Sequence, residues 1–278
     1  MATVLILALA TVVTARLTMR AHREARATLQ AQHDLAWRWL RRSAEANLLP
    51  RAQSILSETS RGPASDRASH RAGRVQARLV LDGNELVVRL EDESSKPHPE
   101  SFVVRDVNEL ADRLALALPE HEIDLRPRQP LDAENDQEDR WLTYRQVARQ
   151  ADVARVWGHS KKPGLTDRLT VFGDGRINLR TIDPERLHEA LRPTLTLEDA
   201  ETLCRLVRTE TVPNADAALA SLGLNRRQQE RIAGRLIDFS ASHGVWLRWA
   251  PASGPTSGFA AIRSMSDEGS ENVGRLIW

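Results

Sequence analysis

The hydrophobic pattern begins with one long helix. The first fifteen residues carry no charge, and the chain continues without glycine or proline as far as Pro50. Leu29, Ala36 and Leu40 recur at helical spacing within it. Residues 1–50 are therefore predicted to form a helix that is apolar at its start and amphipathic later.

The apolar start of this helix is short for a membrane span. A spanning helix needs roughly 20 apolar residues, with about 17 as the lower limit. The run reaches that limit only if residues 17–19 join it and Arg16 snorkels. A secretory signal peptide is the alternative, and residues 8–10 resemble its cleavage site, but such a peptide needs a basic leader. The uninterrupted helix favours an anchor in a membrane or in a bundle of like helices, assembled through Val4, Leu5, Leu7, Leu9 and Val12.

Period-two alternation predicts two hairpins. In residues 51–96, apolar positions alternate on both sides of Asp82-Gly83, a dipeptide that tolerates the positive φ of a tight turn. In residues 241–278, alternation surrounds a turn rich in glycine, serine and proline. The alternating positions are Val75, Ala77, Leu79, Leu81, Leu86, Val88 and Leu90 in the first hairpin, and Val245, Leu247, Trp249, Phe259, Ala261 and Arg263 in the second.

Residues 97–240 are predicted to be a mainly helical block that interrupts the sheet. Within it, residues 169–181 read as a strand (Leu169 to Phe172), a turn and an Asn-containing bend. Residues 183–208 read as a helical hairpin. Asp183 caps its first helix ahead of Pro184, and a Thr196–Asp199 capping box starts its second. The fold class is therefore α+β, with a helical block inside a small antiparallel sheet.

Composition and charge exclude several classes of site. The net charge is +1, so no strong overall field attracts nucleic acid. A single cysteine, Cys204, excludes an intramolecular disulfide framework and is expected to be buried. No HExxH, GxSxG, phosphate-loop or GxGxxG motif occurs, so no catalytic or cofactor-binding residue is predicted. His188 is expected to lie in solvent. An acidic stretch offers weak calcium ligands, without the glycine or spacing of an EF-hand: Asp132, Glu134, Asp136, Glu138 and Asp139.

Several segments, in their order along the chain, resemble one family. "LTVFGDGRINLRTIDPERLHEAL", "VRLEDESSK" and "SHGVWLRWAPASG" are similar to segments of the minor pseudopilins of the type II secretion system, K type (general secretion pathway protein K). The long N-terminal helix resembles their pilin-like spine. The residues that carry the main signature are Gly175, Ile177, Asn178, Leu179, Thr181 and Pro184.

The resemblance implies a structural role rather than catalysis. It implies a pilin-like fold with a SAM-like or helix-hairpin-helix-like block, at the tip of a periplasmic pseudopilus that supports protein secretion. Other minor pseudopilins and inner-membrane secretion components are the implied partners. The implied location is the inner membrane, as a single-pass protein with most of the chain in the periplasm. No acidic residue precedes Glu24, as the resemblance implies for the K type. Arg180 and the "KPHPESF" segment depart from the family pattern, so calcium sites are not carried over.

A membrane-anchored DNA receptor of the competence type is the alternative function, because it also joins an anchor to a helical hairpin. Helix-hairpin-helix modules that bind DNA use glycine in the connection, where bare backbone approaches a phosphate. Here the connection "LRPTLTLEDA" contains no glycine, and its Glu198 and Asp199 would repel a phosphate. A packing hairpin that binds no nucleic acid is therefore favoured.

Overall fold

The computed structural model describes residues 2–61, 73–81, 83–119, 121–126, 144–149, 156–159, 162–252, 256–265 and 271–277. The chain divides into two compact units, residues 1–46 and 47–278. Each unit is described below by itself.

The first unit consists mainly of α1 (Ala2–Ser43), a single helix of 42 residues. Side chains along it are described from Arg16 onward, and every residue from Arg16 to Gln32 is exposed. Among the residues described in this way, no helix combines the length and apolarity needed to cross a bilayer. Val4, Leu5, Leu7, Leu9 and Val12 lie in α1, but their side chains are outside the described residues.

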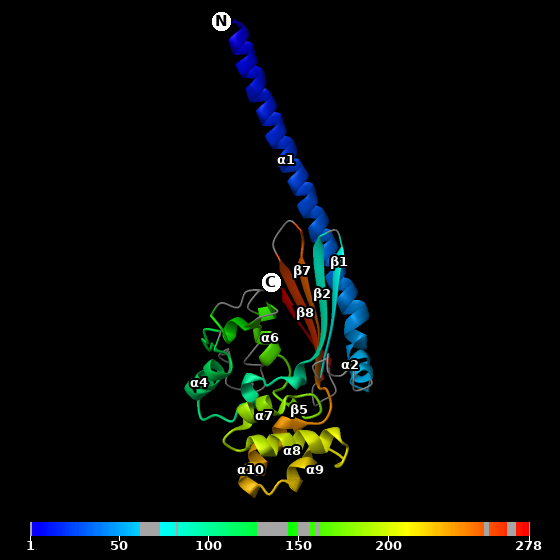
Figure 1. Ribbon diagram of the computed structural model, residues 1–278, viewed down its shortest axis with the longest axis vertical. Coiled ribbons are helices and arrows are strands. Elements are labelled where there is room, and N and C mark those ends of the chain that lie inside the picture. The colour runs from blue at the N-terminus through cyan, green and yellow to red at the C-terminus, as the bar shows by residue number, and fades with distance from the viewer. Residues whose placement is uncertain are drawn as a thin grey trace. The chain divides into compact units, whose positions relative to one another are not determined.

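The second unit contains a five-stranded antiparallel sheet with the order β1-β2-β7-β8-β9 (Figure 1). Both predicted hairpins are present: Leu81 pairs with Asn84 across the first turn, and Leu247 pairs with Phe259 in the second. The strands are β1 (Arg74–Leu81), β2 (Asn84–Asp92), β7 (Ser242–Ala250), β8 (Ser257–Met265) and β9 (Glu271–Ile277).

The central strands of the sheet bury side chains on both faces. On one face, Leu90, Val245 and Leu247 are buried, and α2 (Ala52–Arg61) packs against β2 and β7. On the other face, Val87 and Trp246 belong to the core that the sheet shares with the helical block. The period-two pattern was readable from the sequence because Arg89 and Glu91 alternate in β2 with the apolar residues Val88 and Leu90.

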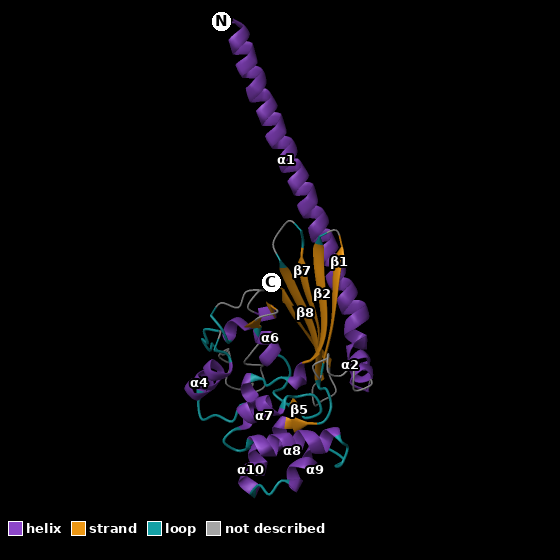
Figure 2. Ribbon diagram, viewed as in Figure 1, coloured by secondary structure: helices purple, strands orange, loops and turns teal. Residues whose placement is uncertain are grey.

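The helical block lies between β2 and β7 in the chain, and Figure 2 shows it as short helices joined by loops. Side-chain caps start its helices: Asp106 starts α4, Asp183 starts α7 and Thr196 starts α8. The α-helices are α4 (Val107–Ala117), α6 (Leu165–Arg168), α7 (Pro184–Leu191), α8 (Leu197–Arg208), α9 (Ala215–Ser221) and α10 (Arg226–Ile232). The short strands are β3 (Gly158–His159), β4 (Lys162–Pro163), β5 (Ile177–Asn178) and β6 (Leu236–Ile237), and the 3-10 turns are η2 (Leu49–Arg51), η3 (Glu93–Ser95), η4 (Pro99–Ser101), η5 (Tyr144–Gln146) and η6 (Ala233–Arg235). This arrangement confirms the predicted α+β class.

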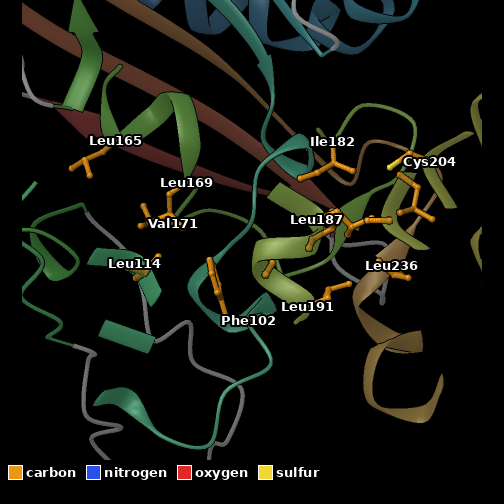
Figure 3. Packing of buried hydrophobic residues seen from close by; sticks show 14 of the residues in the cluster. Phe102, Leu114, Leu165, Leu169, Val171, Ile182, Leu187, Leu191, Cys204 and Leu236 are labelled. Carbon is orange, nitrogen blue, oxygen red and sulfur yellow. The ribbon is translucent and has the colours of Figure 1, made fainter. Parts of the chain in front are cut away.

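The core of the block is built by the predicted helical hairpin and the segment before it. Ile182, Leu187 and Leu191 are fully buried, and Figure 3 shows them in one cluster with Phe102 and Leu236. Cys204 lies in the same cluster and is buried as expected. Burial raises the pKa of its thiol to about 11, so the group remains a protonated, unreactive thiol at neutral pH.

Two details of the sheet prediction were wrong. Residues 169–172 form no strand: Leu169 and Val171 are buried, but the backbone between them donates a single bond from Thr170 N to Pro97 O. Their alternation reflects a loop that inserts two side chains into the core. Strand β9 was not predicted, because "ENVGRLI" has little apolar alternation and contains Gly274.

Candidate functional site

Backbone hydrogen bonds hold residues 175–184, which we call the signature segment. Gly175 has a φ of 78°, which favours glycine. Ile177 and Asn178 form β5, which pairs in parallel with β6. Leu179 N continues this pairing by donating to Ile237 O at 2.9 Å. Ile177 and Leu179 are fully buried, so the segment runs through the hydrophobic core.

One buried carboxylate connects this segment to the sheet. Asp92, the last residue of β2, is only 2% exposed. Its Oδ2 accepts from Asn178 Nδ2 at 2.9 Å and from Thr181 Oγ1 at 2.7 Å. Its Oδ1 accepts from Ser94 N at 3.0 Å and from Ser240 Oγ at 2.8 Å. We call Asp92, Ser94, Asn178, Thr181 and Ser240 the Asp92 cluster.

The Asp92 cluster joins three parts of the chain that are far apart in sequence. Burial raises the pKa of Asp92, and the hydrogen bonds from Thr181, Ser240 and Asn178 oppose that rise. The four donors replace the water that the carboxylate loses on burial. The cluster is therefore a fastening between the end of β2, the signature segment and the chain that enters β7.

A second buried group of charges lies beside it. Lys96 Nζ contacts Glu91 Oε2 at 2.6 Å and Glu93 Oε2 at 2.9 Å. Arg74 forms ion pairs with Glu91 and Asp167, the latter at 2.5 Å. Three acids and three bases meet here, so their charges balance, and we call them the ion network: Arg74, Arg89, Glu91, Glu93, Lys96 and Asp167.

The ion network also binds the aromatic core. Trp246 Nε1 donates to Glu93 Oε1 at 2.8 Å, and Lys96 Nζ lies 5.5 Å from the centre of the Trp246 ring. The Arg89 guanidinium lies 4.4 Å from the ring centre of Trp157, close enough for a cation–π interaction. Asp167 belongs to α6, so the network fastens the helical block to β1 and β2.

His98 is the buried histidine closest to the signature segment. Its Nδ1 accepts from Glu100 N at 3.2 Å and caps η4. Burial lowers its pKa to about 4, against the attraction of Asp174 and a backbone bond with Val171. The ring is neutral at pH 7 and acts as a cap.

A cavity of about 800 Å³ opens between the ion network and α7. Arginine and carboxylate side chains line much of it, and some of these are paired: Arg78 and Arg248 both contact Glu85, at 2.8 and 2.7 Å. Among the described residues, the lining contains no serine, threonine, tyrosine, cysteine or histidine. The cavity therefore presents no nucleophile of these types beside a histidine base, the arrangement that nucleophilic catalysis uses.

The structure places the predicted site residues in different surroundings. Asn178 and Thr181 meet at Asp92, while Ile177 and Leu179 serve the core. Pro184 is the first residue of α7, as predicted.

The five calcium candidates, Asp132, Glu134, Asp136, Glu138 and Asp139, lie outside the described residues. Elsewhere in the chain, the described residues contain no group of three metal-ligating side chains. His188 is half-buried and its Nδ1 bonds Leu195 O at 2.9 Å, so the expectation that it lies in solvent was wrong.

We expect Asn178→Ala to lower the free energy of unfolding by about 1–3 kcal/mol. The side chain is 3% exposed, donates to Asp92 and accepts from Arg180 N at 3.0 Å. Alanine would leave both partners without this bond. Urea unfolding of the full chain measures the change, with the exposed residue Asn108 replaced by alanine as the control. Equal unfolding midpoints for wild type and Asn178→Ala would contradict a structural role.

The connection between α7 and α8 does not offer backbone donors to a phosphate. Pro193 has no amide hydrogen, and Leu195 is buried. Four amides of the connection already donate to acceptors within the helical pair: those of Arg192, Thr194, Leu195 and Thr196. The connection is therefore part of the packing of α7 on α8.

We predict that the protein binds neither duplex nor single-stranded DNA in a salt-dependent way. Fluorescence anisotropy of labelled DNA at low salt measures this, because phosphate contacts weaken steeply as salt rises. Micromolar or tighter binding that is lost in the double variant Arg192→Glu/Arg205→Glu would instead support the DNA-receptor alternative.

Comparisons with known proteins give one solved structure to report. No family model matches the chain, and no curated protein matches it. Among solved structures, the chain is similar to a chain in the crystal structure of the GspK-GspI-GspJ complex from the type 2 secretion system of enterotoxigenic Escherichia coli. The match covers 90% of this chain and 99% of that chain, with 13% identity and a TM-score of 0.42.

Proposed function

We propose that this protein is a non-enzymatic minor pseudopilin at the tip of a type II secretion pseudopilus, where it supports protein secretion across the outer membrane. The ordered set of segments that resemble the K type supports this proposal. The Asp92 cluster supports it too, because it explains the signature residues as a fastening between sheet and helical block, with no catalytic role.

The observation that carries the proposal is the exposed apolar surface of α1. Leu17 is 62% exposed and Trp39 is 63% exposed. Further large apolar side chains that are more than half exposed on the same helix are Met19, Leu29 and Leu35. Exposed apolar surface on this scale marks an interaction site. In a bundle of like helices it would be buried, as pseudopilus assembly requires.

The start of α1 completes the proposal. Residues 1–15 contain no charge, and an anchored helix of marginal length gains burial from neighbouring helices. We therefore place the protein in the inner membrane as a single-pass protein, with most of the chain in the periplasm. Its proposed partners are inner-membrane secretion components and other minor pseudopilins, of the kinds named in the solved GspK-GspI-GspJ complex.

Co-purification tests the proposal. The full chain should retain the I- and J-type pseudopilins of its own source from detergent-solubilised membranes. Leu29→Glu/Leu35→Glu should reduce this recovery at least about tenfold, because two carboxylates would enter an apolar contact. Gln30→Glu, an exposed change on the same helix, is the control. Recovery of neither pseudopilin by the wild-type chain, with normal secretion after deletion of the gene, would refute the proposal.

A further inference from the structure

Four arginines follow directly after the uncharged start of α1. They are Arg16, Arg20, Arg23 and Arg26, and we call them the arginine collar. At about 100° per residue, the first three fall within an arc of about 60° on one side of the helix. They span about 10 Å along the helix axis, at 1.5 Å per residue. Arg26 lies about one turn further along, about 60° beyond the edge of this arc.

The arginine collar is open to solvent. All four side chains are exposed. Arg20 pairs with Glu24 at 2.8 Å, but both side chains stay largely exposed, at 78% and 66%. Glu24 is the only acidic residue between positions 16 and 26, so this stretch carries a net charge of +3 with His22 neutral. The excess positive charge is therefore concentrated within three helical turns.

The turns that carry the arginine collar also expose apolar side chains. Leu17 is 62% exposed and Met19 is 59% exposed. At about 100° per residue, these two side chains flank the arc of the first three arginines, and Ala21 and Ala25 lie on the opposite side. Arginines that follow directly after an apolar stretch of a helix suit the boundary between hydrocarbon and headgroups. There the arginine stems lie along the apolar surface while the guanidinium groups reach the polar layer.

We propose that the arginine collar binds anionic phospholipid headgroups at the bilayer surface. A guanidinium donates two parallel hydrogen bonds to a phosphate, and the pair is charge-assisted. The axial span of about 10 Å is enough to cross the headgroup layer, which is about 5–8 Å deep on each side, since a bilayer of about 40–45 Å encloses a core of about 30 Å. This inference goes beyond the proposed function, because assembly with other pseudopilins does not require a particular lipid.

Flotation of the full chain with lipid vesicles tests the proposal. Two compositions are compared: phosphatidylcholine alone, and phosphatidylcholine with phosphatidylglycerol. The protein is added from detergent that is then diluted away. The measured quantity is the ratio of the two partition coefficients, which separates headgroup binding from insertion of the apolar residues.

The collar variant replaces Arg16, Arg20 and Arg23 by glutamine, which keeps a similar helix propensity. Each arginine near an anionic surface contributes roughly fivefold to partition, so the loss of three should lower the ratio by about 100-fold. The corresponding lysine variant should keep most of the ratio, since it keeps the charge. The matched control replaces three exposed arginines elsewhere by glutamine, Arg205, Arg227 and Arg231, and should leave the ratio unchanged.

A ratio near one for the wild-type chain, or an equal fall in the collar variant and the control, would overturn the proposal. If the collar variant loses recovery of the other pseudopilins but keeps the lipid ratio, the collar contacts an acidic partner helix instead, and the lipid proposal fails. If the lipid ratio is absent while co-purification persists, the proposed function stands without the collar. If instead the wild-type chain shows the lipid ratio but recovers neither pseudopilin, the lipid proposal stands and the proposed function fails.

Discussion

Replacing Asp92 by alanine should lower the free energy of unfolding by about 3–5 kcal/mol. Three side-chain donors, from Asn178, Thr181 and Ser240, would lose a buried acceptor at once, together with the amide of Ser94. Each unsatisfied buried donor costs about 1–3 kcal/mol, and these costs are not additive. For a chain of this size, the melting temperature should fall by about 6–20 °C, measured by circular dichroism.

Two further variants make the Asp92 prediction specific. Asp216→Ala removes an exposed carboxylate from the first turn of α9 and should change stability by less than about 1 kcal/mol. Asp92→Asn preserves the shape of the side chain but points an amide donor toward other donors, so it should also be strongly destabilising. If Asp92→Ala unfolds like the Asp216 control, the cluster is not the fastening described here.

Replacing Lys96 by methionine should lower the free energy of unfolding by about 3–5 kcal/mol at pH 7. The lysine is 2% exposed and lies between two buried carboxylates, those of Glu91 and Glu93. Removing one partner of a buried ion pair leaves charge without compensation, which costs more than the pair itself gains. Urea unfolding of both proteins measures the difference.

The same variant should be less sensitive to acid. Burial raises the pKa of Glu91, but attraction by Lys96, Arg74 and Arg89 outweighs burial and lowers it to about 2. A carboxyl whose folded pKa is lowered adds stability above its ordinary value, near 4.5, and this stability is lost as pH falls from about 4.5 to about 2. Without Lys96 the folded pKa rises, so the difference from wild type should shrink at pH 3.

An exposed cation provides the control for this result. Arg78 pairs with Glu85, and its side chain is 64% exposed. Arg78→Met should therefore cost less than about 1 kcal/mol, with little change between pH 7 and pH 3. The prediction fails if Lys96→Met lowers the free energy of unfolding as little as Arg78→Met does. It also fails if the loss is the same at pH 7 and pH 3, because Lys96 would then not stabilise the ionised form of Glu91.

Most of the fold could be predicted because local chemistry agreed with tertiary packing. Leu81 pairs with Asn84, as the predicted hairpin requires, and Asp183 and Thr196 cap helices at the predicted positions. The errors arose where local pattern and tertiary pairing differ. Val171 is buried without belonging to a ladder, and β9 is a strand because β8 offers it a free edge.

The buried polar clusters were harder to predict. The sequence identified Asn178 and Thr181, and it drew attention to "EDESSK", but nothing local shows that Asp92 accepts from residues 86 and 89 positions later. Nothing in the sequence predicted that Ser240 would contact Asp92, since a single serine before a strand is common. The ion network was missed for a related reason: β-strand arginines normally suggest a solvated face, whereas Arg89 is 5% exposed.

The position of the helical block between two neighbouring strands also has a consequence for folding kinetics. β2 and β7 are adjacent in the sheet, yet Asp92 and Ser240 lie 148 residues apart in sequence. Closing so long a loop costs entropy before the strand pairing can repay it, and folding rates fall as contacts become less local. The helical pair α7–α8 consists of local contacts and can form early. Once the block has folded, pairing of β5 with β6 brings Ser240, which lies just before β7, close to Asp92 at the end of β2. The block is thus suited to be the nucleus on which the central strands of the sheet close.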